Sequence, residues 1–141
     1  MITKKTFVQG IKKGIKVIVE LSKYIIPSVF AIKVLEHSGL LERISAFMAP
    51  YMSYIGLPGE GALVLLFGQV SIYGAIGAML PLGLTAKQIT ICCSIIAICH
   101  AIILETVIVN KSGANGFLNA GIRFLAAVAT GLVLNLIIPG V

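Results

Sequence analysis

Charge is scarce in this sequence, and one charged residue type is missing. Only 11% of the 141 residues are charged, there is no aspartate, and the acidic side chains are five glutamates. By contrast, 58% of the residues are hydrophobic and the mean hydropathy is +1.06, whereas a soluble domain is roughly 45–50% apolar. This composition argues against an ordinary soluble domain and indicates an integral membrane protein.

Sequence patterns that would support catalysis or a metal centre are also missing. There is no Walker motif, which excludes ATP hydrolysis by this chain, and no C-x-x-C or H-x-x-x-H spacing, so a closed zinc site is not expected. Transient contact of Cys99 or His100 with ferrous iron is the metal alternative that stays open. The cysteines are odd in number and lie in one apolar run, which argues against a disulfide framework. We expect neither an enzyme nor a bound cofactor.

Positive charge is concentrated at one end of the chain. Five lysines precede the first apolar segment: Lys4, Lys5, Lys12, Lys13 and Lys16. Such a cluster can bind nucleic acid, but in an apolar chain of net charge +6 the positive-inside rule explains it better. We therefore expect a multi-pass protein of the cell membrane, surrounded by lipid, with a cytoplasmic N-terminus at residues 1–13 and no nucleic-acid partner.

Hydrophobic patterning predicts a single all-α membrane domain over residues 1–141. Strand-like alternation is absent, and glycine, proline and polar clusters separate the apolar stretches. We expect three to four transmembrane helices, a broken or re-entrant helical hairpin and one interfacial amphipathic helix. The expected transmembrane helices cover 14–38, 60–84 (broken or re-entrant), 85–109 and 117–138, and the interfacial helix covers 40–55.

The segment LFGQVSIYGAIGAM, residues 66–79, places polar side chains in the middle of an apolar stretch. Its polar residues are Gln69, Ser71 and Tyr73, and its glycines are Gly68, Gly74 and Gly77. Polar groups within hydrocarbon need partners, and an amide beside a hydroxyl supplies both donors and acceptors to a polar solute. The glycines would let the helix break and display these groups, as broken helices do in transporters. The alternative is close helix packing through small residues.

A second group of polar residues lies in CHAIILETVIVNKSGANG. His100 and Glu105 interrupt an apolar stretch, and Asn110 ends it. His100 and Glu105 are about 140° apart on a regular helix, so they converge only if the helix breaks. They would bind solute or carry a coupling proton. The alternatives are a packed histidine and a glutamate paired with Lys111 or Arg123.

These two segments together resemble the Gate, or nucleoside recognition, family. The likeness extends from about Lys12 to Ile138 and is most distinctive in PYMSYIGLPGEG and in the histidine-to-glutamate segment. That family includes small bacterial and archaeal membrane proteins, parts of concentrative nucleoside transporters, the membrane region of the ferrous iron transporter FeoB, and spore maturation proteins A and B.

The resemblance implies a role for Gln69. GQVS is similar to the hairpin motif in which a glutamine and a following hydroxyl residue recognise the base. Gln69 matches the glutamine, whereas Val70 and Ser71 depart from the hydroxyl and acidic residues that follow it in the family. Larger relatives contain inverted repeats with an odd number of crossings, which fits this chain if 60–84 is re-entrant. The implied assembly is a homo-oligomer, such as a dimer, or a pair with an opposite-facing paralogue.

The expected function is therefore that of a small transporter protomer. It would move a small polar solute, such as a nucleoside or nucleobase, by alternating access. The expected solute-binding residues are Gln69, Ser71, Tyr73, His100, Glu105 and Asn110. A non-transporting assembly partner of the spore maturation type and a component of a divalent metal-ion permease are the alternatives.

Overall fold

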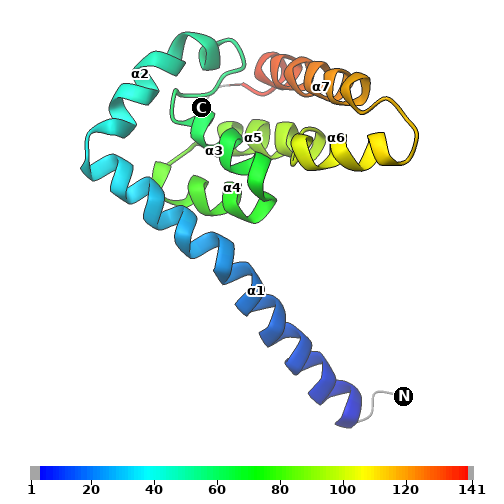
Figure 1. Cartoon of the computed structure of the whole chain (residues 1–141). Helices are drawn as coiled ribbons and strands as arrows, with labels where there is room; N and C mark the ends of the chain where they lie inside the picture. The colour runs from blue at the N-terminus through cyan, green and yellow to red at the C-terminus, as the bar shows by residue number, and fades with distance from the viewer. Residues whose placement is uncertain (1–3, 140–141) are drawn as a thin grey trace.

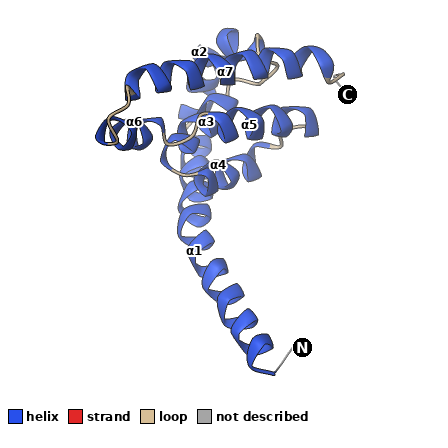
Figure 2. Ribbon diagram, turned by 90° about the vertical axis from the view of Figure 1, so that its right-hand side faces the viewer, coloured by secondary structure: helices blue, strands red, loops and turns tan. Residues whose placement is uncertain are grey.

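The computed structural model describes residues 4–139, and every regular element in that range is helical (Figure 2). The elements are α1 (Lys4–His37), α2 (Leu40–Ser53), α3 (Gly61–Val70), α4 (Ile72–Met79), a 3-10 helix (Leu80–Leu82), α5 (Ala86–Ile98), α6 (Ile102–Lys111) and α7 (Gly116–Ile137). The all-α prediction is confirmed. Both α2 and α7 begin and end within two residues of the stretches expected to be helical.

Helix α1 is longer than the sequence patterns predicted. It begins at Lys4 rather than near residue 14 and continues through Pro27 to His37. At 1.5 Å per residue its 34 residues extend about 50 Å. Its C-terminal half packs on α4 and contacts α2, while its N-terminal half projects away from the body of the molecule (Figure 1).

Two stretches of the described chain are long and apolar enough to cross a membrane. They are Ala86–Lys111, which α5 and α6 share, and Gly116–Ile137, which is α7. Only 28% and 11% of their apolar windows are buried inside the molecule, whereas the core helix of a soluble protein is mostly buried. Their exposed apolar surface fits lipid. The expected span at 14–38 does not meet the same criterion, because charged residues such as Glu20 and Lys23 recur along it.

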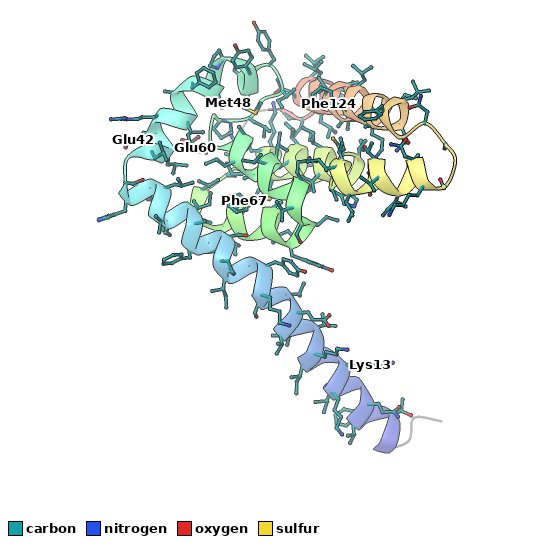
Figure 3. The ribbon with its side chains drawn as sticks, in the orientation of Figure 1. Lys13, Glu42, Met48, Glu60, Phe67 and Phe124 are labelled. Carbon is teal, nitrogen blue, oxygen red and sulfur yellow. The ribbon has the colours of Figure 1, made fainter. Side chains whose placement is uncertain are left out.

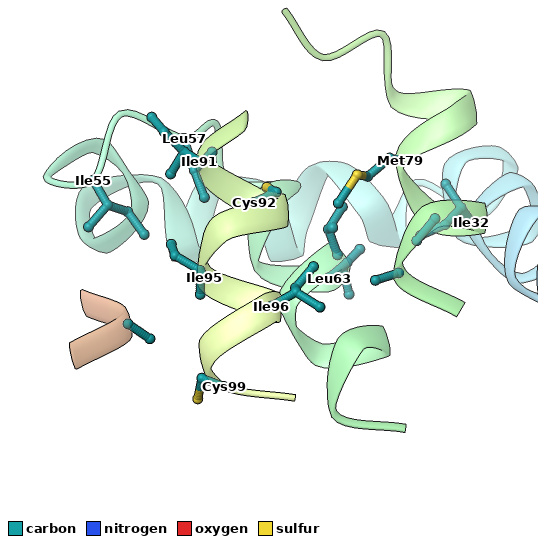
Figure 4. Close-up of a cluster of buried hydrophobic side chains, with 14 of the residues drawn as sticks. Ile32, Ile55, Leu57, Leu63, Met79, Ile91, Cys92, Ile95, Ile96 and Cys99 are labelled. Atoms are coloured by element: carbon teal, nitrogen blue, oxygen red, sulfur yellow. The ribbon is translucent and has the colours of Figure 1, made fainter. Parts of the chain in front are cut away.

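The core lies where the short central helices meet the C-terminal half of α1. Helix α4 packs against α1 and α3, α3 also contacts α5, and α7 covers α5 and α6. The largest fully buried side chains are Ile32, Val64, Ile91 and Cys92, which come from α1, α3 and α5 (Figure 4). This arrangement brings α3, α5 and α6 together around the polar residues described next.

Candidate functional site at two broken helices

The first helix break lies at Ser71, inside the stretch predicted to be broken. Helix α3 ends at Val70 and α4 begins at Ile72, while Ser71 has extended backbone angles of φ −162° and ψ 138°. The Ser71 hydroxyl accepts a hydrogen bond from the Tyr73 amide at 3.2 Å, which is the geometry of a helix N-cap. The two helices contact each other, and we call them the α3–α4 pair.

The three glycines of this stretch serve close packing, and none of them lies at the break. A Cβ on Gly77 would come 2.9 Å from the carbonyl oxygen of Ile25 in α1, and one on Gly74 would come 3.3 Å from the hydroxyl of Ser28. On Gly68 it would come 3.1 Å from the Ile96 side chain. The glycines therefore let α3 and α4 approach α5 and α1 closely, and the chain breaks at a serine because its hydroxyl caps the next helix.

A second break divides the stretch 85–109, for which the sequence predicted one continuous helix. Helix α5 ends at Ile98 and α6 begins at Ile102. Between them Cys99 has φ −132° and ψ 59°, and Ala101 has φ 46°, in the left-handed region that residues with a side chain rarely adopt. This conformation costs roughly 1–2 kcal/mol relative to a helical one, so interactions around the break must stabilise it.

Gln69 supplies part of that stabilisation from the neighbouring broken segment. Its side-chain amide donates to the carbonyl oxygen of Cys99 at 2.8 Å, and its amide oxygen accepts from the backbone N–H of Ile102 at 3.3 Å. One side chain near the end of α3 thus forms hydrogen bonds with a backbone acceptor and a backbone donor that the second break leaves without helical partners. The two broken segments are joined through this residue.

Glu105 is the centre of a charged cluster formed by His100, Glu105 and Arg123. Arg123 of α7 pairs with the carboxylate, and its Nε donates to the carbonyl oxygen of Ile98 at 2.7 Å. His100 Nε2 lies 3.6 Å from the other carboxylate oxygen. All three side chains are between 23% and 30% exposed, so the cluster is shielded but reachable. The break makes this convergence possible, because it ends the helical geometry that would separate His100 from Glu105.

A hydrogen bond to the backbone indicates the tautomer of the His100 ring. Its Nδ1 lies 3.1 Å from the carbonyl oxygen of Ile96, and a carbonyl oxygen can only accept, so Nδ1 carries the hydrogen. Neutral His100 therefore has its unprotonated Nε2 toward Glu105, and a proton added there would create an ion pair with the carboxylate.

The other predicted site residues lie apart from this cluster. Ser71 caps α4, and the Tyr73 ring lies 6.2 Å from the ring of Tyr24 on α1. Asn110 accepts from the Gly116 amide at 2.8 Å and so fixes the turn between α6 and α7. Of the predicted set, the structure thus brings His100 and Glu105 together and bonds Gln69 to the backbone of the same break, and it places the remaining three in other local contacts.

A hollow of about 400 Å³ opens beside Gln69, between α2, α3, α5, α6 and α7. Gln69 provides the polar part of its lining, together with apolar side chains that include Leu65, Ile95, Cys99 and Phe124. A second hollow of about 330 Å³ lies between α1 and the α3–α4 pair, and its lining includes Ser71. Gln69 and Ser71 therefore border different cavities. Among the described residues no group of three or more His, Cys, Asp or Glu side chains is placed to hold a metal ion.

Sequence reasoning missed the second break and underrated Arg123. Neither glycine nor proline occurs in Cys99–His100–Ala101, so no composition signal indicated a break there. Arg123 was considered only as one of two partners for Glu105. An arginine within an apolar helix was the available signal, because a charge in that position needs a partner.

Comparison with known proteins places this sequence in a family of membrane proteins. The family model described as "Gate: Nucleoside recognition" matches residues 18–115, which include α2 to α6 and both helix breaks. The chain therefore belongs to the Gate family. The uncharacterized membrane protein YvoD of Bacillus subtilis is 29% identical over 138 residues, which are 97% of this chain and 44% of YvoD.

Two further relatives match shorter regions. Spore maturation protein B of Bacillus subtilis is 33% identical over 53% of this chain and 42% of that protein. The inner membrane protein YjiG of Escherichia coli K12 is 31% identical over 60% of this chain and 59% of that protein. The chain thus spans about half the length of these curated relatives. No solved structure shows a significant match.

Proposed function

We propose that this protein is a membrane transporter protomer that moves a small polar solute, most simply a nucleoside or nucleobase, by alternating access. The observation that carries the proposal is the junction of two broken helices through Gln69, next to the charged cluster. Transporter sites are formed where helices are interrupted, because the interruption leaves backbone polar groups available to a solute.

The chemistry around Gln69 suits a flat solute with a polar edge. The hollow beside it has apolar walls that would contact the faces of a nucleobase, while an amide can donate to and accept from the edge of the ring. In the present conformation that amide bonds to Cys99 and Ile102. Solute binding would therefore exchange these two bonds for bonds to the solute and loosen the second break, which links occupancy to conformation.

The charged cluster is positioned to couple transport to proton movement. His100 Nε2 faces the Glu105 carboxylate at 3.6 Å. A proton bound by this pair would therefore change how strongly His100 and Arg123 each interact with that carboxylate. Ser71, Tyr73 and Asn110 stay predicted solute contacts along the path. We place the protein in the plasma membrane with its N-terminus in the cytoplasm, in keeping with the lysine-rich N-terminal sequence.

A transport unit would need more than one such chain. Because this chain aligns with 44% of YvoD, that relative has room for a second unit of similar size. A homodimer, or a pair with an opposite-facing paralogue, would supply the equivalent second unit here.

A second candidate function is that of a non-transporting assembly partner in the membrane. It is favoured by the observation that Gln69 already uses both ends of its amide within the chain, and by the likeness to spore maturation protein B. In that role the two breaks would shape a surface for another protein, and no solute would bind.

A thermal-shift screen of the detergent-solubilised protein tests these candidates against each other. A ligand that binds the native state raises the melting temperature, and the increase grows with the logarithm of ligand concentration relative to Kd. We expect stabilisation by a nucleoside or nucleobase, and its loss in Gln69→Ala but not in Gln9→Ala, a glutamine on the exposed part of α1. Stabilisation by divalent cations alone would favour a metal permease, and no stabilisation by any solute would favour the assembly role.

A further inference from the structure

The N-terminal half of α1 is exposed from residue 6 onward. Every residue from 6 to 20 is exposed, and this segment, which we call the arm, projects well beyond the other helices (Figure 1). Its large apolar side chains are 49% to 66% exposed; they are Phe7, Val8, Ile11, Ile15, Val17, Ile18 and Val19. So much exposed apolar surface on a single helix indicates a contact outside this chain.

The two long sides of the arm differ in character. At 100° per residue, one side carries Gln9, Lys12, Lys13, Lys16 and Glu20, and the opposite side carries Phe7, Ile11, Ile15 and Ile18. No ion pair neutralises the three lysines among the described residues, and Lys13 extends from the arm far from the body (Figure 3). A helix that is basic on one side and apolar on the other is typical of binding in the interface of an anionic membrane.

The direction of α1 agrees with this pattern. Figures 1 and 2 both show α1 steeply inclined to α7 and to the α5–α6 stretch, which are the two stretches suited to cross a bilayer. If those two cross the membrane, α1 runs more along its surface than through it. Most of the arm, residues 6–17, also precedes the family match, which begins at residue 18.

We propose that the arm lies on the membrane surface, with Phe7, Ile11, Ile15 and Ile18 in the headgroup–acyl boundary and Lys12, Lys13 and Lys16 against anionic lipid headgroups. The apolar side supplies hydrophobic burial, and the lysines make the contact depend on lipid charge. Each lysine near an anionic surface strengthens the attraction by about fivefold. The arm thereby anchors the C-terminal half of α1, which packs on α4, the helix that follows the first break.

The chain offers a clean probe because it contains no tryptophan. Single tryptophans are introduced by Ile11→Trp and by Gln9→Trp, two positions about 200° apart on the helix. The full-length variants are reconstituted into vesicles of phosphatidylcholine alone or mixed with phosphatidylglycerol. Quenching by acyl-chain-brominated lipid and by aqueous iodide is compared at low and at high salt.

In anionic vesicles we expect lipid quenching of the Ile11→Trp protein at least twice that in phosphatidylcholine vesicles, and iodide quenching of the Gln9→Trp protein. Lipid quenching of the Ile11→Trp protein should no longer depend on phosphatidylglycerol at high salt. The same loss is expected when three further substitutions are added together: Lys12→Gln, Lys13→Gln and Lys16→Gln. Three results would overturn the proposal: equal iodide quenching at both positions in anionic vesicles; equal lipid quenching at both, as in a membrane-spanning helix; or shielding of position 11 from both quenchers regardless of lipid charge, as expected if another protein chain covers it.

Discussion

At the scale of single residues, the site is explained by what each polar group must bond to in an apolar setting. The second break releases consecutive carbonyl groups at the end of α5, and two side chains from other helices reach them: Arg123 donates to Ile98 and Gln69 donates to Cys99. Leaving these carbonyl groups without a donor would lower the stability of the fold, since a buried polar group that lacks a hydrogen-bond partner costs about 1–3 kcal/mol. Both residues therefore hold the break in place as well as bordering the candidate site.

Arg123→Ala should destabilise the protein by about 1–3 kcal/mol, because it leaves the Glu105 carboxylate and the Ile98 carbonyl without their donor. Arg123→Lys should be intermediate, because lysine keeps the charge but cannot reproduce two directed bonds. The measurement is thermal unfolding in detergent, with Lys111→Ala as a control for loss of an exposed positive charge. An Arg123→Ala melting temperature equal to that of the control would contradict the role given to Arg123.

At the scale of helices, interruption and close packing have separate causes in this chain. The breaks occur at Ser71 and at residues 99–101, where side chains satisfy the released backbone groups. Gly74 and Gly77 lie at the contact with α1. Substitutions that distinguish a broken helix from a continuous one, and a tight contact from a loose one, test these assignments.

Ala101→Gly should leave the protein as stable or raise its stability by up to about 1 kcal/mol, because glycine adopts a positive φ without the steric cost that alanine incurs. Ala97→Gly, four residues earlier inside α5 and exposed, should lower stability by about 0.5–1 kcal/mol. The measurement is thermal unfolding of the two variants, whose melting temperatures are compared with that of the natural chain. If both substitutions destabilise equally, the helix is continuous at Ala101.

Gly77→Ala should separate α1 from α4 and lower stability, because its Cβ would meet backbone atoms of Ile25 at 2.9 and 3.0 Å. Gly121→Ala is the matched control: it lies in α7 with no neighbour within 4 Å of the new Cβ, so its higher helix propensity should stabilise the protein by about 0.5–1 kcal/mol. We expect the melting temperature to fall in Gly77→Ala and to rise in Gly121→Ala. A stabilised Gly77→Ala protein would show that α1 does not pack closely here.

At the scale of the whole molecule, the sequence predicted the membrane character and the helical class, while solute binding by Gln69, His100 and Glu105 stays a prediction. Gln69, His100 and Glu105 could be found because polar groups in apolar segments are conspicuous. The second break could not be found, since its conformation depends on a hydrogen bond from Gln69, 30 residues earlier. The full length of α1 could not be found either, because the lysines before residue 14 indicate a cytoplasmic N-terminus and no apolar stretch extends the helix back to Lys4.

This small chain carries two kinds of surface. Helices α5 to α7 expose apolar side chains that suit lipid, while Gln69 and the charged cluster lie at the junction of the broken helices. A transporter needs both, a lipid-stable frame and an interruption that a solute can use. The central claim is that the solute binds at Gln69.

Uptake into liposomes tests that claim most directly. Purified protein is reconstituted, and the time course of uptake of a radiolabelled nucleoside or nucleobase identified by the thermal-shift screen is measured over a range of concentrations. We predict saturable uptake by the natural chain and by Gln9→Ala, and none by Gln69→Ala, with His100→Ala slowed. Uptake that is unchanged by both Gln69→Ala and His100→Ala would contradict the account.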